Sequence, residues 1–154
     1  QGEAYLTALV FVNYELSAWR NEKLSAHNLN YWQFGDYLAI GAGAHGKVTQ
    51  PDGVYRFQKT RLPKDYLAKV PAENLQFKRI EDEEMPFEFM MNALRLNQGV
   101  DAKLYAERTG LSLDSLNDLL TSLRQRKLML EDSSRISCTE QGHVFLNSVL
   151  EEFL

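Results

Sequence analysis

The stretch DAKLYAERTGLSLDSLNDLLTSLRQRKLMLEDSSRISC, residues 101–138, carries the clearest folding pattern in the chain. Asp101 can cap a short helix that ends near Gly110, and Ser112 can cap a second helix. The second helix has a leucine stripe with helical spacing, formed by Leu113, Leu116, Leu120 and Leu123. Strand-like runs on either side of the polar residues 132–134 then predict a hairpin.

Helices are predicted on both sides of this stretch. Upstream, PFEFMMNALRLNQGV (86–100) places apolar residues at helical spacing, namely Phe87, Met90, Met91 and Leu94. Acidic residues 82–84 favour the start of this helix, and Gly99 is positioned to end it. Downstream, Thr139 can cap a last helix. Its expected buried side consists of Phe145, Leu146, Val149, Leu150, Phe153 and Leu154. Helices, hairpin and closing helix together predict a winged-helix-like domain over residues 81–154.

Residues 1–80 have a different character, with more aromatic residues, glycines and strand-like runs. Strands are predicted at 10–16, 37–40 and 54–60. Pro51-Asp52-Gly53 is typical of a turn, and Pro63 is well placed at the first position of a short helix. The chain as a whole is therefore predicted to have an α+β fold.

Composition and charge narrow the function classes. The 154 residues are 44% hydrophobic and 25% charged, ordinary values for a globular protein. No apolar run approaches the ~18 residues of a membrane span, and the N-terminus does not resemble a signal peptide. The single cysteine, Cys138, cannot form an internal disulfide or a zinc knuckle, so a reducing, cytoplasmic location is expected.

The two halves of the chain differ in charge. Residues 81–154 hold seven Lys or Arg and 14 Asp or Glu, a net charge of −7, whereas residues 1–80 hold ten and seven, a net charge of +3. This asymmetry suggests two units with different partners. The helix-turn-helix pattern in the second half resembles a DNA-binding unit. However, phosphate binding requires positive charge, so we expect no DNA partner.

Glycines follow the strand predicted at 37–40. Gly41, Gly43 and Gly46 match G-x-G-x-x-G, which suggests a dinucleotide site when it opens a helix. The residues that follow, KVTQPDGVY, carry no helical stripe, so the context for a dinucleotide is missing. The loop can instead bring backbone close to some other ligand, or it is a tight turn without one.

The sequence HNLNYW (27–32) is a dense polar and aromatic cluster. A neutral imidazole can ligate iron, and flat aromatic rings can sandwich a flat macrocycle, so His27, Tyr31 and Trp32 are candidate ligand-binding residues. The alternative is that His27 and Asn28 cap a helix and Trp32 packs in a core. A basic run in residues 47–80 either meets ligand carboxylates or forms a solvated face. No catalytic constellation is recognisable, and Cys138 is interpreted as structural.

Several strings together resemble a known family. They are YELSAW (14–19), HNLNYW (27–32), GDYLAIGAGAHG (35–46), the 86–100 segment and TEQGHVFLNSVLEEFL (139–154). They resemble the C-terminal part of the oxygen-independent coproporphyrinogen III oxidase-like radical SAM proteins, with the haem-chaperone (HemW-type) branch as the better match. The resemblance covers nearly the whole chain. Arg20 and Gly46 depart from the small or hydroxyl residues expected at those positions.

The resemblance implies a longer parent. Family members open with a C-x-x-x-C-x-x-C motif that holds a four-iron cluster, which binds S-adenosylmethionine. That motif is absent here, so the chain is expected to be a C-terminal fragment and inactive alone, although its parent resembles a radical SAM oxidoreductase. Residues 1–80 would be the closing strands and helices of an incomplete β/α barrel. Such strands expose unpaired edges, so we expect a homodimer or strand exchange.

The resemblance also implies a site and a function. His27 is the candidate haem ligand, with Asn28, Tyr31 and Trp32 beside it. The candidate ligand loop consists of Gly41, Gly43 and His45, at the carboxyl end of a barrel strand. The expected function is haem binding and transfer, with haem or a porphyrin as ligand. One alternative is a fragment of an oxidase of porphyrin biosynthesis, and another is a winged-helix interaction module.

Overall fold

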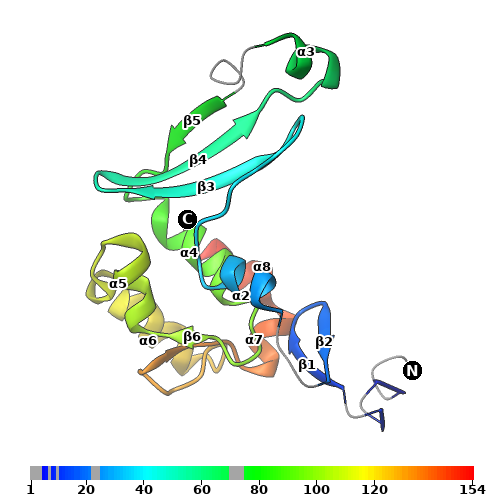
Figure 1. Ribbon diagram of the computed structural model, residues 1–154. Helices are drawn as coiled ribbons and strands as arrows, with labels where there is room; N and C mark the ends of the chain where they lie inside the picture. Colours follow the sequence, from blue (N-terminus) through cyan, green and yellow to red (C-terminus); the bar gives the residue numbers. More distant parts are fainter. Residues whose placement is uncertain (1–4, 7, 10, 22–24, 70–74) are drawn as a thin grey trace.

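A computed structural model describes residues 5–6, 8–9, 11–21, 25–69 and 75–154 (Figure 1). It mixes helices and small sheets, as the sequence predicts. The elements are, in chain order, β1 (Val12–Glu15), β2 (Ala18–Arg20), α2 (Ala26–Trp32), β3 (His45–Gln50), β4 (Gly53–Lys59), α3 (Pro63–Ala68), β5 (Leu75–Arg79), α4 (Met85–Ala93), β6 (Val100–Asp101), α5 (Lys103–Thr109), the 3-10 helix η2 (Leu113–Leu116), α6 (Asn117–Gln125), β7 (Arg135–Ile136), α7 (Glu140–Val144) and α8 (Leu146–Glu151).

Each described sheet is antiparallel. β1 pairs with β2, β3-β4-β5 form a three-stranded sheet, and β6 pairs with β7. The predicted turn at Pro51 and Asp52 joins β3 to β4, in a register that pairs Gln50 with Gly53. The strands predicted at 10–16 and 54–60 are confirmed as β1 and β4, except that residue 10 lies outside the described residues. The parallel barrel strands remain a prediction.

The strand predicted at residues 37–40 is wrong for this structure. Tyr37 forms one bridge with Lys47, and residues 38–40 form no ladder. Leu38 and Ile40 are 79% and 91% exposed. An apolar run becomes a strand only when a neighbouring strand pairs with it, and the described residues offer none beyond this bridge.

The main helix of the second half buries a wider surface than the predicted stripe, of which Met90 and Leu94 are fully buried. α4 buries Met85, Phe89, Met90 and Ala93, whereas Phe87 and Met91 are only partly buried. The helix also ends earlier than predicted. Its last residue is Ala93, and Gly99 lies in a later turn with a φ of +59°, where a Cβ would collide with the carbonyl of Ile136. The stripe predicted only part of this surface because α4 packs against α2, α5 and α8.

Ser112 and Thr139 are confirmed as N-caps, whereas the N-cap residue of α5 is Ala102 and Asp101 lies one residue before it. Asp101 Oδ1 accepts from the Lys103 N–H (2.9 Å), and Gly110 ends α5 in the left-handed region. Ser112 Oγ accepts from the Asp114 N–H, and Thr139 Oγ1 accepts from the Gly142 N–H (3.0 Å). Short polar side chains at these positions satisfy N–H groups that have no intrahelical partner.

The last helix does not run as predicted. It breaks at Phe145 into α7 and α8. Val149 and Phe153 are buried as expected, but Phe145 and Leu154 are 52% and 84% exposed. Because the break changes the helix direction, one apolar stripe cannot continue along both pieces.

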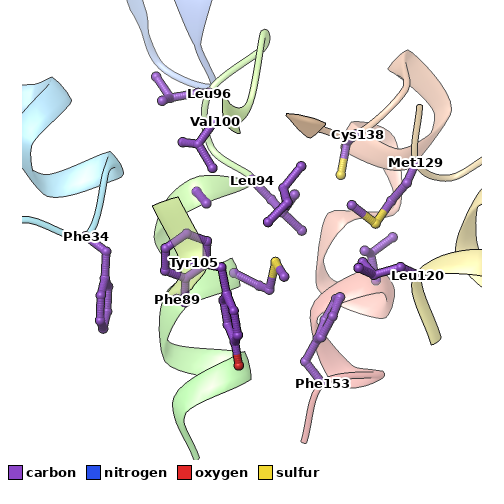
Figure 2. Packing of buried hydrophobic residues seen from close by; sticks show 14 of the residues in the cluster. Phe34, Phe89, Leu94, Leu96, Val100, Tyr105, Leu120, Met129, Cys138 and Phe153 are labelled. Atoms are coloured by element: carbon purple, nitrogen blue, oxygen red, sulfur yellow. The ribbon is translucent and has the colours of Figure 1, made fainter. Parts of the chain in front are cut away.

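One hydrophobic core joins the two halves of the chain. Phe34 packs on Phe89 with ring centroids 5.6 Å apart, and Phe89 meets Tyr105 edge-on at 5.2 Å (Figure 2). Figure 2 shows the chain of contacts from Phe34 beside α2, through α4, to Met129 and Phe153. The domain boundary near residue 80 remains a prediction, and side chains from both sides of it share this core.

Cys138 belongs to the same core and has no thiol partner. It is 3% exposed and forms an isolated antiparallel bridge with Met129. Burial raises the pKa of its thiol to about 12, so the thiolate is scarce at neutral pH. These observations agree with a structural role.

We predict that Phe89→Ala lowers the free energy of unfolding by about 3–5 kcal/mol, because it removes a fully buried ring and leaves a cavity. Urea unfolding followed by tryptophan fluorescence measures the change. Leu154→Ala is the control, since that side chain is exposed and should change the free energy by less than about 0.5 kcal/mol. Equal effects of the two substitutions would contradict the shared core.

Cys138 should resist alkylation in the native chain. We expect iodoacetamide at neutral pH to leave the folded protein unmodified and to label it once urea unfolds it, because the thiol is buried and its pKa is high. Mass spectrometry of the intact chain reads the result. Rapid stoichiometric labelling without denaturant would show that the thiol is accessible.

Candidate functional site

The helix α2 carries the candidate ligand residues and is fixed at both ends. Ser25 Oγ accepts from the Asn28 N–H (3.3 Å), which caps the first turn. The Asn28 amide donates to the Tyr14 hydroxyl (3.1 Å), so β1 holds this residue. At the other end, Gly35 N–H donates to the Asn30 carbonyl (2.7 Å) after a left-handed residue, Phe34. Asn28 therefore both closes the cap and anchors the helix.

A row of aromatic rings begins at His27. The His27 and Tyr31 rings lie edge-on, with centroids 4.8 Å apart and planes at 83°. The Tyr31 ring then contacts Tyr37 at 4.5 Å. Residues four apart share one face of a helix, so this contact follows from the sequence spacing. His27 is exposed, and an external ligand can reach its imidazole.

Trp32 faces the interior rather than the His27 side. The Arg95 guanidinium lies 4.5 Å from the Trp32 ring centroid, and Arg95 also approaches the buried Glu15 carboxylate at 3.8 Å. The Trp32 indole N–H is buried without a hydrogen-bond partner among the described residues. The Trp32 ring therefore lies on the core side of Tyr31, and the two ring centroids are 6.5 Å apart.

The glycine loop forms a tight turn before β3. Gly41 and Gly43 have φ values of +99° and +70°, and the Gly43 N–H donates to the Thr60 carbonyl (2.9 Å). A strand rather than a helix follows the loop, which agrees with the lack of a helical stripe in this part of the sequence. His45 is exposed and pairs with Gln58 in β4. In Figure 1 this loop lies at the end of the sheet near α3, and the described contacts do not link it to His27.

Two cations of the basic run, Lys47 and Arg56, form contacts with other residues of the fold. Lys47 pairs with Arg56 across β3 and β4. Arg56 Nε donates to Glu88 of α4 (3.0 Å), and its Nη1 donates to the Tyr37 hydroxyl (3.3 Å). Burial opposes the charge of Arg56, but the Glu88 carboxylate outweighs it and the pKa of Arg56 is raised. The solvated-face interpretation is therefore wrong for Lys47 and Arg56.

The sequence did not identify Tyr37, Lys47, Arg56 and Glu88 as neighbours of the candidate helix. Arg56 and Glu88 are 32 residues apart, and their meeting depends on the sheet register and on the position of α4. The only local signal was Lys47, the residue directly after the glycine loop.

The chain does not fit a resident four-iron cluster. Such a cluster needs several cysteine thiolates, and the chain has one, which is buried. Over the described ranges, no three His, Cys, Asp or Glu side chains gather to hold a metal ion. None of the helices in those ranges is long and apolar enough to cross a membrane.

Comparison with known proteins gives consistent matches. The family described as HemN C-terminal domain matches residues 80–145. The heme chaperone HemW of Haemophilus influenzae is 42% identical over 157 residues, covering all of this chain and 40% of that protein. The heme chaperone HemW of Escherichia coli is 41% identical and is covered to 41%, and that of Bacillus subtilis is 32% identical over 92% of this chain. The chain thus spans about two fifths of the length of these relatives.

A solved structure has the same fold. The coproporphyrinogen III oxidase (HemN) of Escherichia coli, a radical SAM enzyme, matches 99% of this chain and 39% of its own, with a TM-score of 0.65 and 15% identity. At that identity the match concerns the fold alone. Residues 80–145 therefore match the HemN C-terminal domain, and the whole chain is similar to the C-terminal part of HemW-type proteins and has the fold of the corresponding part of HemN.

Proposed function

We propose that this chain contributes to haem binding and transfer, as the C-terminal part of a radical SAM haem-handling protein. The observation that carries the proposal is the exposed His27 imidazole, held edge-on by Tyr31 at the start of an aromatic row. The names of the relatives, which are heme chaperones at 42% and 41% identity, support the same function.

In this proposal haem is cargo, and His27 supplies its axial ligand. A neutral imidazole nitrogen donates its lone pair to iron, and the edge-on Tyr31 ring limits how far the imidazole rotates. Asn28 holds the helix that carries the ligand, and Trp32 packs behind it. Among the basic residues, Arg61 and Lys64 are exposed and remain candidates for the propionates.

The glycine loop is a second proposed contact. Gly41 has open space where a side chain would stand, and His45 is exposed close by, whereas Gly43 packs near Arg61. A ligand that reached this loop would bind near α3 rather than near His27. Because His27 is exposed, a recipient protein can approach the iron, which suits transfer rather than permanent storage.

We propose a winged-helix-like domain for residues 81–154, and closing barrel elements for residues 1–80. The order α4, β6, α5, α6, β7 supports the first assignment. β7 pairs with β6, and Cys138, two residues after β7, forms a further antiparallel bridge with Met129. The net charge of −7 favours a protein partner over DNA.

An oxidase of porphyrin biosynthesis remains the second candidate for the parent protein. The fold match to the oxidase, at 15% identity, carries no information about substrate. We infer a cytoplasmic location from the single reduced thiol.

Haem titration tests the ligand role of His27. We expect His27→Ala to weaken haem binding roughly tenfold or more and to shift the Soret band, because the axial nitrogen is lost. His143→Ala is the matched control, since His143 Nε2 lies 3.1 Å from the Leu94 carbonyl within the fold. His45→Ala tests the loop. Unchanged spectra and affinity in His27→Ala would remove the ligand role.

Sedimentation tests self-association. Leu38, Ile40 and Phe77 are 79%, 91% and 56% exposed on one side of the β3-β4-β5 sheet, so we expect the isolated chain to dimerise there. Ile40→Asp should yield a monomer, and Leu154→Asp, at an exposed position in the other half, should remain dimeric. A monodisperse monomer for the unsubstituted chain would count against this surface.

A further inference from the structure

The chain is strained where α2 ends. Phe34 has a φ of +55°, in the left-handed region that bulky residues rarely adopt. Glycine usually occupies such a position at the end of a helix. Here a glycine would lose the packing of a buried ring against Phe89 of α4. The turn therefore needs an interaction that holds it in place.

Lys47 supplies that interaction. Its side chain is 3% exposed, and its Nζ donates to the Phe34 carbonyl at 2.8 Å. The same ammonium lies 3.9 Å from the centroid of the Phe34 ring and 3.5 Å from Asp36 Oδ1. A buried ammonium is costly unless it is paired, so these contacts define one position for the turn.

The backbone of Lys47 holds the next residues. Its N–H and carbonyl form two hydrogen bonds with Tyr37, at 3.0 and 2.9 Å. The Asp36 carboxylate also accepts from the Thr49 N–H (2.9 Å) and hydroxyl (2.8 Å). Residues 34–37 are thus fixed to β3 by Lys47 and by its neighbour on the same face, Thr49.

This fixed turn reaches the candidate ligand through two contacts. The Phe34 N–H donates to the Tyr31 carbonyl (3.0 Å), and the Tyr37 ring packs on the Tyr31 ring at 4.5 Å. Tyr31 in turn contacts His27 at 4.8 Å. A shift of residues 34–37 must therefore move the ring against which the His27 imidazole rests.

We propose that Lys47 is a positioning residue for the haem site: its ammonium holds the left-handed Phe34 turn, so that Tyr37 and Tyr31 keep the His27 imidazole in one orientation. This inference rests on the proposed function for its biological meaning. The positional link itself is independent of haem and can be measured without it.

The charges around Lys47 predict a pH dependence. Burial lowers its pKa to about 8, although Asp36 opposes this effect, and the cations Arg56 and Arg108 lower it further. Tyr37 and Glu88 also face this cluster, through their contacts with Arg56. Above pH 8 the neutral amine loses its attraction to Asp36 and to the Phe34 ring, so the hold on the turn weakens.

The free energy of unfolding should increase with pH over the range in which the hold on the turn weakens. The pKa of Lys47 is about 8 in the fold and 10.5 in its ordinary state, so the unfolded chain binds more protons between these values. This group therefore makes the free energy of unfolding rise with pH across that window. If Lys47 only stabilised the fold, the free energy of unfolding would decrease over the same pH range in which the His27 orientation changes.

The test compares Lys47→Met with the unsubstituted chain by proton NMR, following the His27 Cε1–H resonance assigned with His27→Ala. We expect the resonance of the unsubstituted chain to show a shift with a midpoint near pH 8, because Lys47 titrates there. In Lys47→Met the resonance should be displaced and independent of pH in that range, because the group that titrates there is gone. Lys59→Met, in β4, is the matched control.

An unchanged His27 resonance and pH profile in Lys47→Met would overturn the proposal. If that variant does not fold, Asp36→Asn decides. It removes the charge that supports Lys47⁺, so the midpoint should move below pH 8, and an unmoved midpoint would overturn the proposal.

Haem titration then separates this inference from the proposed function. If haem binds through His27, Lys47→Met should lower the affinity several-fold while the Soret maximum stays, and unchanged affinity would overturn the positioning role. If the unsubstituted chain binds no haem, the proposed function fails, and the NMR result still decides whether Lys47 orients His27.

Discussion

The packing of Phe34 on Phe89 is the contact on which the rest of the structure depends. Phe34 ends the helix that carries His27, and Phe89 lies in the centre of α4 with no exposed surface. This contact connects α2 and its adjoining turn to the helical core. The cost of a left-handed phenylalanine is offset because its ring is buried and its carbonyl receives the Lys47 ammonium.

Local signals in the sequence predicted local structure well. Ser112 and Thr139 cap helices, and Asp101 bonds the first N–H of α5, because their short side chains bond the backbone within three residues, whatever the remaining chain does. The Pro51-Asp52 turn and the i,i+4 contact of His27 with Tyr31 have the same local origin. The family resemblance rested on short strings such as HNLNYW (27–32) and GDYLAIGAGAHG (35–46), and the comparisons confirmed it.

The predictions that were wrong concern segments whose structure depends on residues far away in the sequence. Residues 37–40 have a strand-like composition, but a strand also needs a neighbour, and a single bridge to Lys47 is formed. The predicted stripe of α4 does not describe its buried surface, because other helices contact α4 from several sides and leave Phe87 and Met91 only partly buried. The closing helix was predicted as one continuous helix, but it breaks at Phe145. For the same reason the helix with the candidate ligand was predictable from HNLNYW, whereas the residues of β3, β4 and α4 that support it were not.

The charge asymmetry also acquires a different meaning in the folded chain. It suggested two units with different partners, yet several of these charged side chains meet each other across the predicted boundary near residue 80. Arg56 binds Glu88, Lys78 approaches Glu84, and Arg79 contacts both Glu81 and Asp82. The exposed pairs contribute little individually, whereas the half-buried Arg56–Glu88 pair also fixes Tyr37. Part of the asymmetry therefore serves to orient the sheet on the helical half. Within the basic run, Arg61 and Lys64 are exposed, at the end of the sheet that carries the glycine loop.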